Sequence, residues 1–400
     1  MQLTYNFFHA GNKWCQTSRL TRKLHLFFVV LHCAFLSFLI LLALTSTGIC
    51  ENNAESETKT SLIAAPYIAG GSDEGIEFGL SAGISRYPVL MMYFTGSVST
   101  KGYSSTSIRG EFSTGNFRYS GEISGSRVLR YLFPPQPDFP DEYASALIDR
   151  LEFNLAMLKP VSDELEFGPK IAIDIAEGNE IEYIDGTPGL SSTLPRFGYG
   201  ISSQLGLMGR FHTTSTFRPT DGILAELSLL GGNASGVNLE KSVLDFSSEI
   251  SFVYAKLLSD NWRYYWRGWW GHQHSTAPPN QFSIGGKNTL RGQRDQRYFG
   301  RRAVSSRLQL TYSVMERWEL PKRVVKAVWK SFPLTDLDIE AVAFYDAGTT
   351  GDPEYGWYKT RHGLGAGIRL VSPPEMTFFI DVARSPGGDL RIYMGAGETL

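Results

Sequence analysis

The stretch FSIGGKNTLRGQRDQRYFGRRAVSSRLQLTYSV, residues 282–314, contains two kinds of sequence. Residues 282–302 are rich in Gly, Arg, Asn and Gln, which is too polar and too often interrupted by glycine for a strand or a helix, so they predict a long loop. Residues 303–314 alternate between apolar and polar side chains, and this period of two predicts a β-strand with one apolar face. The apolar face comprises Val304, Leu308, Leu310, Tyr312 and Val314, and the polar face Arg307, Gln309, Thr311 and Ser313.

The predicted loop is crowded with arginine, and burying it would be costly unless acidic side chains met it. The cluster comprises Arg291, Arg294, Arg297, Arg301 and Arg302, with Asp295 among them. Two readings stay open: an exposed arginine-rich loop without a special role, or a loop that finds acidic partners.

Similar alternation recurs from residue 61 to the C-terminus, in runs separated by turn-forming residues. We count sixteen runs, and short and long connections alternate between them. Their bounds are 61–70, 75–85, 89–100, 104–113, 116–131, 147–160, 165–176, 196–213, 223–230, 244–258, 262–274, 303–317, 338–349, 362–371, 376–384 and 389–397.

Run length decides between a soluble β-sandwich and a membrane barrel. Runs of about ten residues match the ~9–11 residues that a tilted strand needs to cross a bilayer. Sandwich strands are nearer ~5–6 residues. Aromatic residues also gather near the ends of runs, as in 264–270, which is typical of membrane interfaces. We therefore predict an all-β fold, a transmembrane antiparallel β-barrel of about sixteen strands over residues 61–400.

Composition excludes several functions. The 400-residue chain has a formal net charge of −2 and no dominant basic stripe, which argues against nucleic acid as a partner. All three cysteines (Cys15, Cys33 and Cys50) lie in the first fifty residues. A thiolate nucleophile or a Cys-ligated metal is therefore not expected downstream.

The N-terminal region resembles a targeting segment. Residues 1–25 end in basic side chains, and 26–44 form an almost unbroken apolar run that is long enough for a membrane helix. A basic region, an apolar core and a small-residue ending also describe a secretory signal, which we favour over residues 1–50. Residues 51–60 would then be a short linker. Lipidation at Cys50 is an alternative, although residues 47–49 fit a lipoprotein motif poorly.

The order of the motifs in 282–314 resembles the signature loop and following strand of the BamA/TamA-type outer-membrane barrels, the bacterial surface-antigen superfamily. The resemblance implies a loop folded back into the barrel lumen, where an Arg-Gly-aromatic motif meets acidic residues of the inner wall. Two departures weaken it, since Gln293 stands where an aromatic is usual and Gln309 where an acid is usual. The implied loop motif is Gly285, Gly286, Leu290, Arg291, Gly292 and Gln293, and the implied inner-wall partners are Asp346, Phe344, Gln309 and Glu340.

Asp346-Ala347-Gly348, which follows aromatic residues, resembles the family's penultimate signature, whose acid meets the loop arginine. We therefore expect Asp346 to pair with Arg291. The alternative is that Asp346 merely faces water in the lumen.

Nothing in the sequence predicts an enzyme. Histidines suited to catalysis by type are present (His212, His272, His274 and His362), but no Gly-x-Ser-x-Gly elbow accompanies them. His272 and His274 form an HxH pair, which alone is a weak metal signal and more simply marks the barrel rim. We expect no cofactor and no metal.

The resemblance implies a function without chemistry, namely assisting the insertion or translocation of proteins or lipids at the bacterial outer membrane. Implied partners are outer-membrane lipids and unfolded outer-membrane proteins or periplasmic chaperones, served by a monomeric barrel. The alternative is a pore-forming or structural surface antigen without a client. Residues 51–60 are too short for the periplasmic POTRA repeats that usually precede such barrels, which favours the alternative, whereas the loop motif favours the first function. Residues 321–332 form either an amphipathic helix at the rim or an extended turn.

Overall fold

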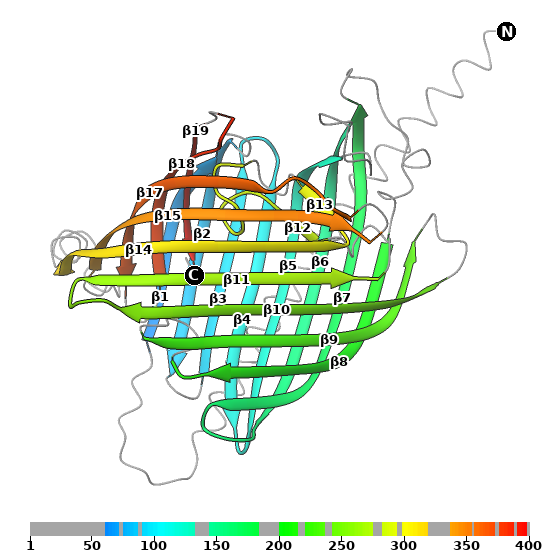
Figure 1. Ribbon diagram of the computed structural model, residues 1–400, viewed down its shortest axis with the longest axis horizontal. Helices are drawn as coiled ribbons and strands as arrows, with labels where there is room; N and C mark the ends of the chain where they lie inside the picture. Colours follow the sequence, from blue (N-terminus) through cyan, green and yellow to red (C-terminus); the bar gives the residue numbers. More distant parts are fainter. Residues whose placement is uncertain are drawn as a thin grey trace. The chain divides into compact units, whose positions relative to one another are not determined.

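Alternating side chains along the chain produce one large antiparallel sheet, seen in the computed structural model (Figure 1). The structure describes residues 61–71, 75–86, 90–132, 144–183, 200–214, 221–236, 242–274, 282–293, 298–318, 337–353, 356–372, 376–387 and 390–397. All of them belong to the unit Thr58–Leu400. The predicted signal (1–50), the linker (51–60) and the candidate helix (321–332) lie outside the described residues.

Nineteen strands are described. They are β1 (Ser61–Gly71), β2 (Gly75–Arg86), β3 (Leu90–Ser99), β4 (Ser104–Thr114), β5 (Phe117–Leu132), β6 (Ala144–Pro160), β7 (Leu165–Tyr183), β8 (Gly200–His212), β9 (Gly222–Gly236), β10 (Val243–Leu257), β11 (Trp262–Gln273), β12 (Phe282–Ile284), β13 (Tyr298–Gly300), β14 (Arg302–Trp318), β15 (Leu337–Asp352), β16 (Gly356–Trp357), β17 (Arg361–Ser372), β18 (Met376–Arg384) and β19 (Leu390–Gly397).

The main sheet closes on itself. Neighbouring strands pair antiparallel in chain order, and β1 returns to β19 through the pair Gly70↔Met394. Of the 17 strands in this sheet, β16 is a two-residue addition beside the end of β15, so sixteen strands form the wall of the barrel. This confirms the predicted all-β barrel and its strand number. The hairpin of β12 and β13 is a separate two-stranded sheet, which was not predicted.

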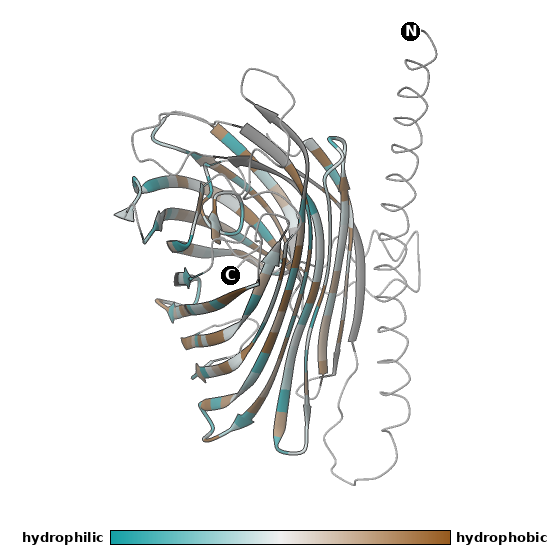
Figure 2. Ribbon diagram, turned by 90° about the vertical axis from the view of Figure 1, so that its right-hand side faces the viewer, coloured by the Kyte–Doolittle hydropathy of each residue, from teal (hydrophilic) through white to brown (hydrophobic). Residues whose placement is uncertain are grey.

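The two faces of the wall differ in polarity, because successive side chains of a strand point to opposite faces. In β10 the exposed Phe246 and Ile250 alternate with the buried Asp245 and Ser247. Figure 2 shows the resulting mixture of hydrophilic and hydrophobic residues along single strands. Large hydrophobic side chains are exposed on the outside of most strands, where lipid would cover them, as expected for a transmembrane barrel. No helix among the described residues is long and apolar enough to cross a membrane.

The aromatic residues of β11 do not all contribute to an outer girdle. Trp262 and Trp266 are exposed on the outer face. Tyr265 is buried on the inner face, and Trp269 packs edge-on against Phe282 of β12. The alternation of the strand explains the split, because residues of opposite parity cannot share one face.

Candidate functional site

The segment between β11 and β14 is anchored by a small apolar cluster. Ile284, Leu290 and Ala303 are fully buried together, and Trp269, Phe282 and Tyr298 pack around them. The hairpin of β12 and β13 supplies three of these residues, Phe282, Ile284 and Tyr298, of which Ile284 and Tyr298 are register partners. This cluster fixes both ends of a tight turn, residues 285–293, which we call the motif turn.

Internal hydrogen bonds shape the motif turn. The Leu290 amide donates to the Gly286 carbonyl at 3.2 Å, and the Gly286 amide donates to the Gln293 carbonyl at 3.2 Å. The Thr289 hydroxyl accepts from the Gly285 amide at 2.8 Å. Gly285, Gly286 and Gly292 have φ of 126°, 81° and 88°, backbone conformations that favour glycine. The predicted loop glycines therefore serve the turn itself.

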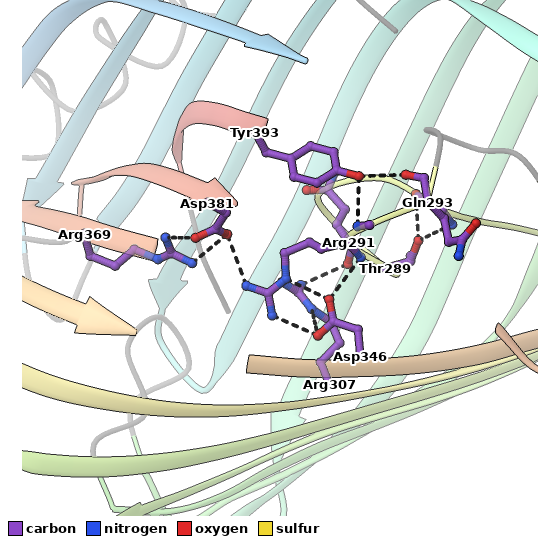
Figure 3. Close-up of polar contacts among 11 residues, drawn as sticks. Thr289, Arg291, Gln293, Arg307, Asp346, Arg369, Asp381 and Tyr393 are labelled. Carbon is purple, nitrogen blue, oxygen red and sulfur yellow. Dashed lines mark hydrogen bonds and ion pairs between the residues drawn. The ribbon is translucent and has the colours of Figure 1, made fainter. Parts of the chain in front are cut away.

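The Arg291 side chain extends from this turn and contacts the carboxylate of Asp346 (Figure 3). Its Nε and Nη2 donate to the two Asp346 oxygens at 2.7 and 2.8 Å, and its backbone amide donates to Asp346 Oδ2 at 3.0 Å. The side chains of Arg291 and Asp346 are 1% and 0% exposed, respectively. A bidentate pair of this kind fixes orientation as well as distance. The structure therefore brings the loop arginine and the inner-wall acid of β15 into direct contact.

A second carboxylate and an aromatic ring complete the arginine's surroundings. Arg291 Nη1 donates to Asp381 of β18 at 3.2 Å, and Arg369 of β17 holds the same carboxylate at 2.6 and 2.9 Å. The guanidinium carbon of Arg291 lies 3.3 Å from the centre of the Phe344 ring. Burial alone would lower the pKa of Arg291, but the hydrogen bonds to Asp346 and the charges of Asp346 and Asp381 raise it above its ordinary value. The side chain stays cationic.

The end of the motif turn is held by the last strand. The Tyr393 hydroxyl of β19 accepts from the Gly292 amide at 3.0 Å and donates to the Gln293 carbonyl at 2.7 Å. The Gln293 side chain accepts from the Tyr298 hydroxyl at 3.0 Å and donates to the His362 carbonyl at 3.3 Å. Gln293 therefore takes part in fixing the turn, although an aromatic is usual at this position in the family that the sequence resembles.

Glycine in β17 allows the turn to approach the wall. A Cβ atom on Gly363 would overlap the backbone carbonyl of Arg291, which has no flexible end to move aside. Its neighbours of the same parity, Gly365 and Gly367, would similarly meet the Phe344 ring and the Asp381 carboxylate. The inner face of β17 is thus hollowed where the motif turn packs.

Gly363→Ala should dislodge the motif turn without unfolding the barrel. We expect a loss of about 1–3 kcal/mol of stability from overpacking. Hydrogen exchange should show lost protection at the amides of Arg291 and Gly292, while strand amides stay protected. Gly209→Ala is the matched control, because a Cβ there would have ordinary contact with Phe167 only. Unchanged protection in Gly363→Ala would contradict the close approach.

Two of the predicted inner-wall residues make their described side-chain contacts away from the motif turn. Gln309 is buried, and its described side-chain bond is to Thr311 at 3.3 Å. Glu340 pairs with Arg263 at 3.3 Å. Neither contact involves the motif turn. Asp381 and Tyr393, which do touch it, were not predicted, and Arg307 Nε approaches Asp346 at 3.7 Å. Arg294 and Arg297 lie outside the described residues, so the burial of the whole arginine-rich loop stays a prediction.

A second buried network occupies the inner wall between β4 and β9. Arg210 of β8 donates to Glu226 at 2.7 Å and pairs with Glu111 at 2.8 Å, with Glu166 3.8 Å away. Arg118 holds the other oxygen of Glu166 at 3.0 Å. This cluster was not predicted from the sequence, since its members are spread over five strands.

The histidines considered as catalytic candidates do not converge. His212 lies 3.5 Å from Glu166, His274 packs against Phe246, and His272 and His362 stack on Trp270 and Tyr345. Among the described residues, no group of three or more His, Cys, Asp or Glu side chains is arranged to hold a metal ion.

Comparison with known proteins gives matches in structure alone. No protein-family model and no curated protein matches the sequence. CdiB from Escherichia coli superposes with a TM-score of 0.53 at 14% identity, over 86% of this chain and 64% of that one. BamA from Haemophilus ducreyi lacking POTRA domains 1–3 gives 0.51 at 13% identity, over 86% and 70%. CdiB from Acinetobacter baumannii gives 0.50 at 12%, over 85% and 60%.

The chain therefore has the fold of the BamA and CdiB barrels of the outer membrane. It spans less than two thirds of the length of either CdiB chain.

Proposed function

We propose that this chain is an outer-membrane barrel that assists the insertion or translocation of proteins without covalent chemistry. Its clients would be unfolded outer-membrane proteins, delivered directly or by periplasmic chaperones. The proposal is supported by the BamA and CdiB fold and by the resemblance of residues 282–314 to the signature loop of BamA/TamA-type barrels.

The observation that carries the proposal is the attachment of the motif turn to the strands beside the closure of the barrel. Arg291 bonds to β15 and β18, and Gly292 and Gln293 bond to Tyr393 of β19. The register pair described between the last strand and the first is Gly70↔Met394, whereas the described pairs of β18 and β19 run from Thr377↔Gly397 to Arg384↔Leu390. Because the motif turn is hydrogen-bonded to β15, β18 and β19, it can control the geometry of the strands that a client would meet.

The test is assisted insertion. The full chain, folded into liposomes, should accelerate the insertion of an unrelated unfolded barrel protein, timed by the shift in its gel mobility when unheated. Arg291→Met should lose most of the acceleration, because the motif turn loses the guanidinium bonds to Asp346 and Asp381. Arg263→Met is the matched control, since Arg263 is an inner-wall arginine that pairs with Glu340 away from the turn. Rates are compared per folded barrel.

Insertion no faster than in empty liposomes would overturn the proposal. An equal loss of acceleration in Arg291→Met and Arg263→Met would show that the motif turn has no specific role in insertion.

A pore is the second candidate, and the inner wall opposite the motif turn favours it. Arg150, Glu152 and Asp174 form an ion-paired group whose side chains keep 22%, 34% and 17% of their surface exposed. Mixed charges that still meet solvent suit a water-filled passage. Steady single-channel conductance in a planar bilayer, combined with no acceleration of insertion, would establish the pore.

A further inference from the structure

One rim of the barrel, the rim that carries the segment between β11 and β14, has an unusual outer surface. Four of its strands end there in a basic or imidazole side chain. His272 is the penultimate residue of β11, Arg302 is the first of β14, His362 is the second of β17 and Arg384 is the last of β18. We call these four residues the basic rim.

The basic rim faces outward. Each member has the same parity as an exposed apolar residue of its own strand, and side chains of one parity share a face. Those exposed residues are Trp266 in β11, Val314 in β14, Leu364 in β17 and Ile380 in β18. The four basic groups therefore lie on the outer face, at the rim end of strands whose outward residues include exposed apolar side chains.

Aromatic rings support the histidines. His272 and Arg302 are register partners on adjacent strands, and the His272 ring stacks on Trp270 at 6.2 Å between centroids. The Nδ1 atom of His272 is buried and has no hydrogen-bond partner among the described residues. Across the rim, His362 Nδ1 bonds to the Tyr345 hydroxyl at 2.6 Å. Tryptophan and tyrosine beside basic groups are typical of the membrane–water interface.

Among the described residues, no nearby acid balances the charge of the basic rim. In the described part of the chain, no ion pair joins Arg302 or Arg384 to a carboxylate, and no acidic residue of outward parity lies at this rim on β11 to β19. Two outward cations elsewhere are paired: Arg127 lies 3.9 Å from Asp149, and Lys256 lies 3.4 Å from Asp221. Within the part of the chain that the structure describes, Arg302 and Arg384 are therefore available to an anionic ligand.

We propose that the basic rim binds the phosphate groups of anionic membrane lipids in the adjoining leaflet. A guanidinium matches phosphate oxygens with two parallel N–H bonds, while the apolar surface below the rim accommodates the acyl chains. A zwitterionic lipid is a poorer ligand, because its ammonium group competes with Arg302 and Arg384 for the phosphate. This inference concerns lipid binding and does not depend on whether the barrel inserts proteins.

Native mass spectrometry of the full chain in a neutral maltoside detergent tests the proposal. Phosphatidic acid should bind more tightly than phosphatidylcholine with the same acyl chains. Arg302→Gln with Arg384→Gln should weaken phosphatidic acid binding about tenfold or more, since each basic group near a lipid surface contributes substantially. Arg127→Gln with Lys256→Gln is the matched control, which removes two outward cations from other places and should change binding less than twofold.

Other outcomes would overturn the proposal. Equal weakening by both pairs would indicate general charge attraction, and no weakening by the first pair would exclude the rim. Competition by glycerol 3-phosphate as strong as that by the lipid would assign the site to soluble phosphates. If the double substitution to glutamine does not fold, Arg302→Lys with Arg384→Lys is the alternative variant. It keeps both positive charges but cannot form the bidentate bond of a guanidinium. It should therefore bind phosphatidic acid with intermediate affinity. Wild-type affinity in that variant would contradict guanidinium recognition.

Discussion

Replacing Arg291 with methionine should lower the free energy of unfolding of the barrel by about 3 kcal/mol or more, because removing one partner of a buried ion pair leaves the other charge uncompensated. The methionine keeps the contact with the Phe344 ring and the backbone amide bond to Asp346, and it loses every side-chain bond to Asp346 and Asp381. Arg307, 3.7 Å from Asp346, relieves part of that charge, which places the effect near the lower end of the ~3–5 kcal/mol range. Urea unfolding from lipid vesicles, followed by tryptophan fluorescence, measures it.

Two controls separate this bond from a general loss of charge. Arg263→Met removes a less buried arginine with a single bond of 3.3 Å to Glu340 and should cost about 1 kcal/mol or less. A double-mutant cycle of Arg291→Met with Asp346→Asn should give an interaction energy toward the upper end of the ~0.5–3 kcal/mol that contacting residues show. Additive effects of the two substitutions would show that the contact contributes nothing specific.

The barrel wall was predictable because each strand satisfies one simple local condition. A strand between lipid and a polar interior must alternate, so the run predicted at 262–274 matches β11 (Trp262–Gln273) almost residue for residue. The condition fails beyond the lipid, where both faces meet water. The run predicted to end at residue 176 continues as β7 to Tyr183, and the run predicted to begin at 147 starts as β6 at Ala144.

The site was predictable only in part. Alternation tells which face of the sheet a side chain is on, but it does not tell how far along the barrel axis that side chain lies. Asp346 and Glu340 share the inner face of β15, but six residues at about 3.3 Å each place them about 20 Å apart along the strand. The motif turn reaches the first and not the second. Parity alone does not tell which of the two acids pairs with Arg291. Asp346 was predicted from the resemblance of its sequence context to the family's penultimate signature.

Asp381 and Tyr393 show a further limit. Both are inward residues of their strands, and Asp381 is the one acidic residue of β18. Which strands present their side chains to the motif turn depends on the stagger between all neighbouring strands. That stagger is a property of the closed sheet, so no local pattern in the sequence contains it. The cluster of carboxylates around Arg210 could not be predicted from the sequence for the same reason, because it too depends on the stagger of the strands.

Arg210→Met should lower the free energy of unfolding at least as much as Arg291→Met does. Arg210 lies on the opposite wall, and there the loss arises from carboxylates that the arginine no longer neutralises. Arg210 is 2% exposed and lies among three carboxylates, those of Glu111, Glu166 and Glu226. Arg118 still compensates Glu166 in the variant. The other two lose their described partner and repel each other in a poorly solvated place, so we expect a loss of about 3–5 kcal/mol in urea unfolding.

Removing negative charge should restore part of this loss. Adding Glu226→Gln to Arg210→Met takes away the carboxylate that lay 2.7 Å from Arg210 and should recover about 1 kcal/mol or more, although Glu226→Gln alone destabilises the wild type. The exposed pair of Lys256 and Asp221 supplies the reference, because Lys256→Met should change stability by less than about 1 kcal/mol. If Glu226→Gln lowers the stability of Arg210→Met further, repulsion among the carboxylates is not the cause, and the loss must come from packing around the long arginine side chain.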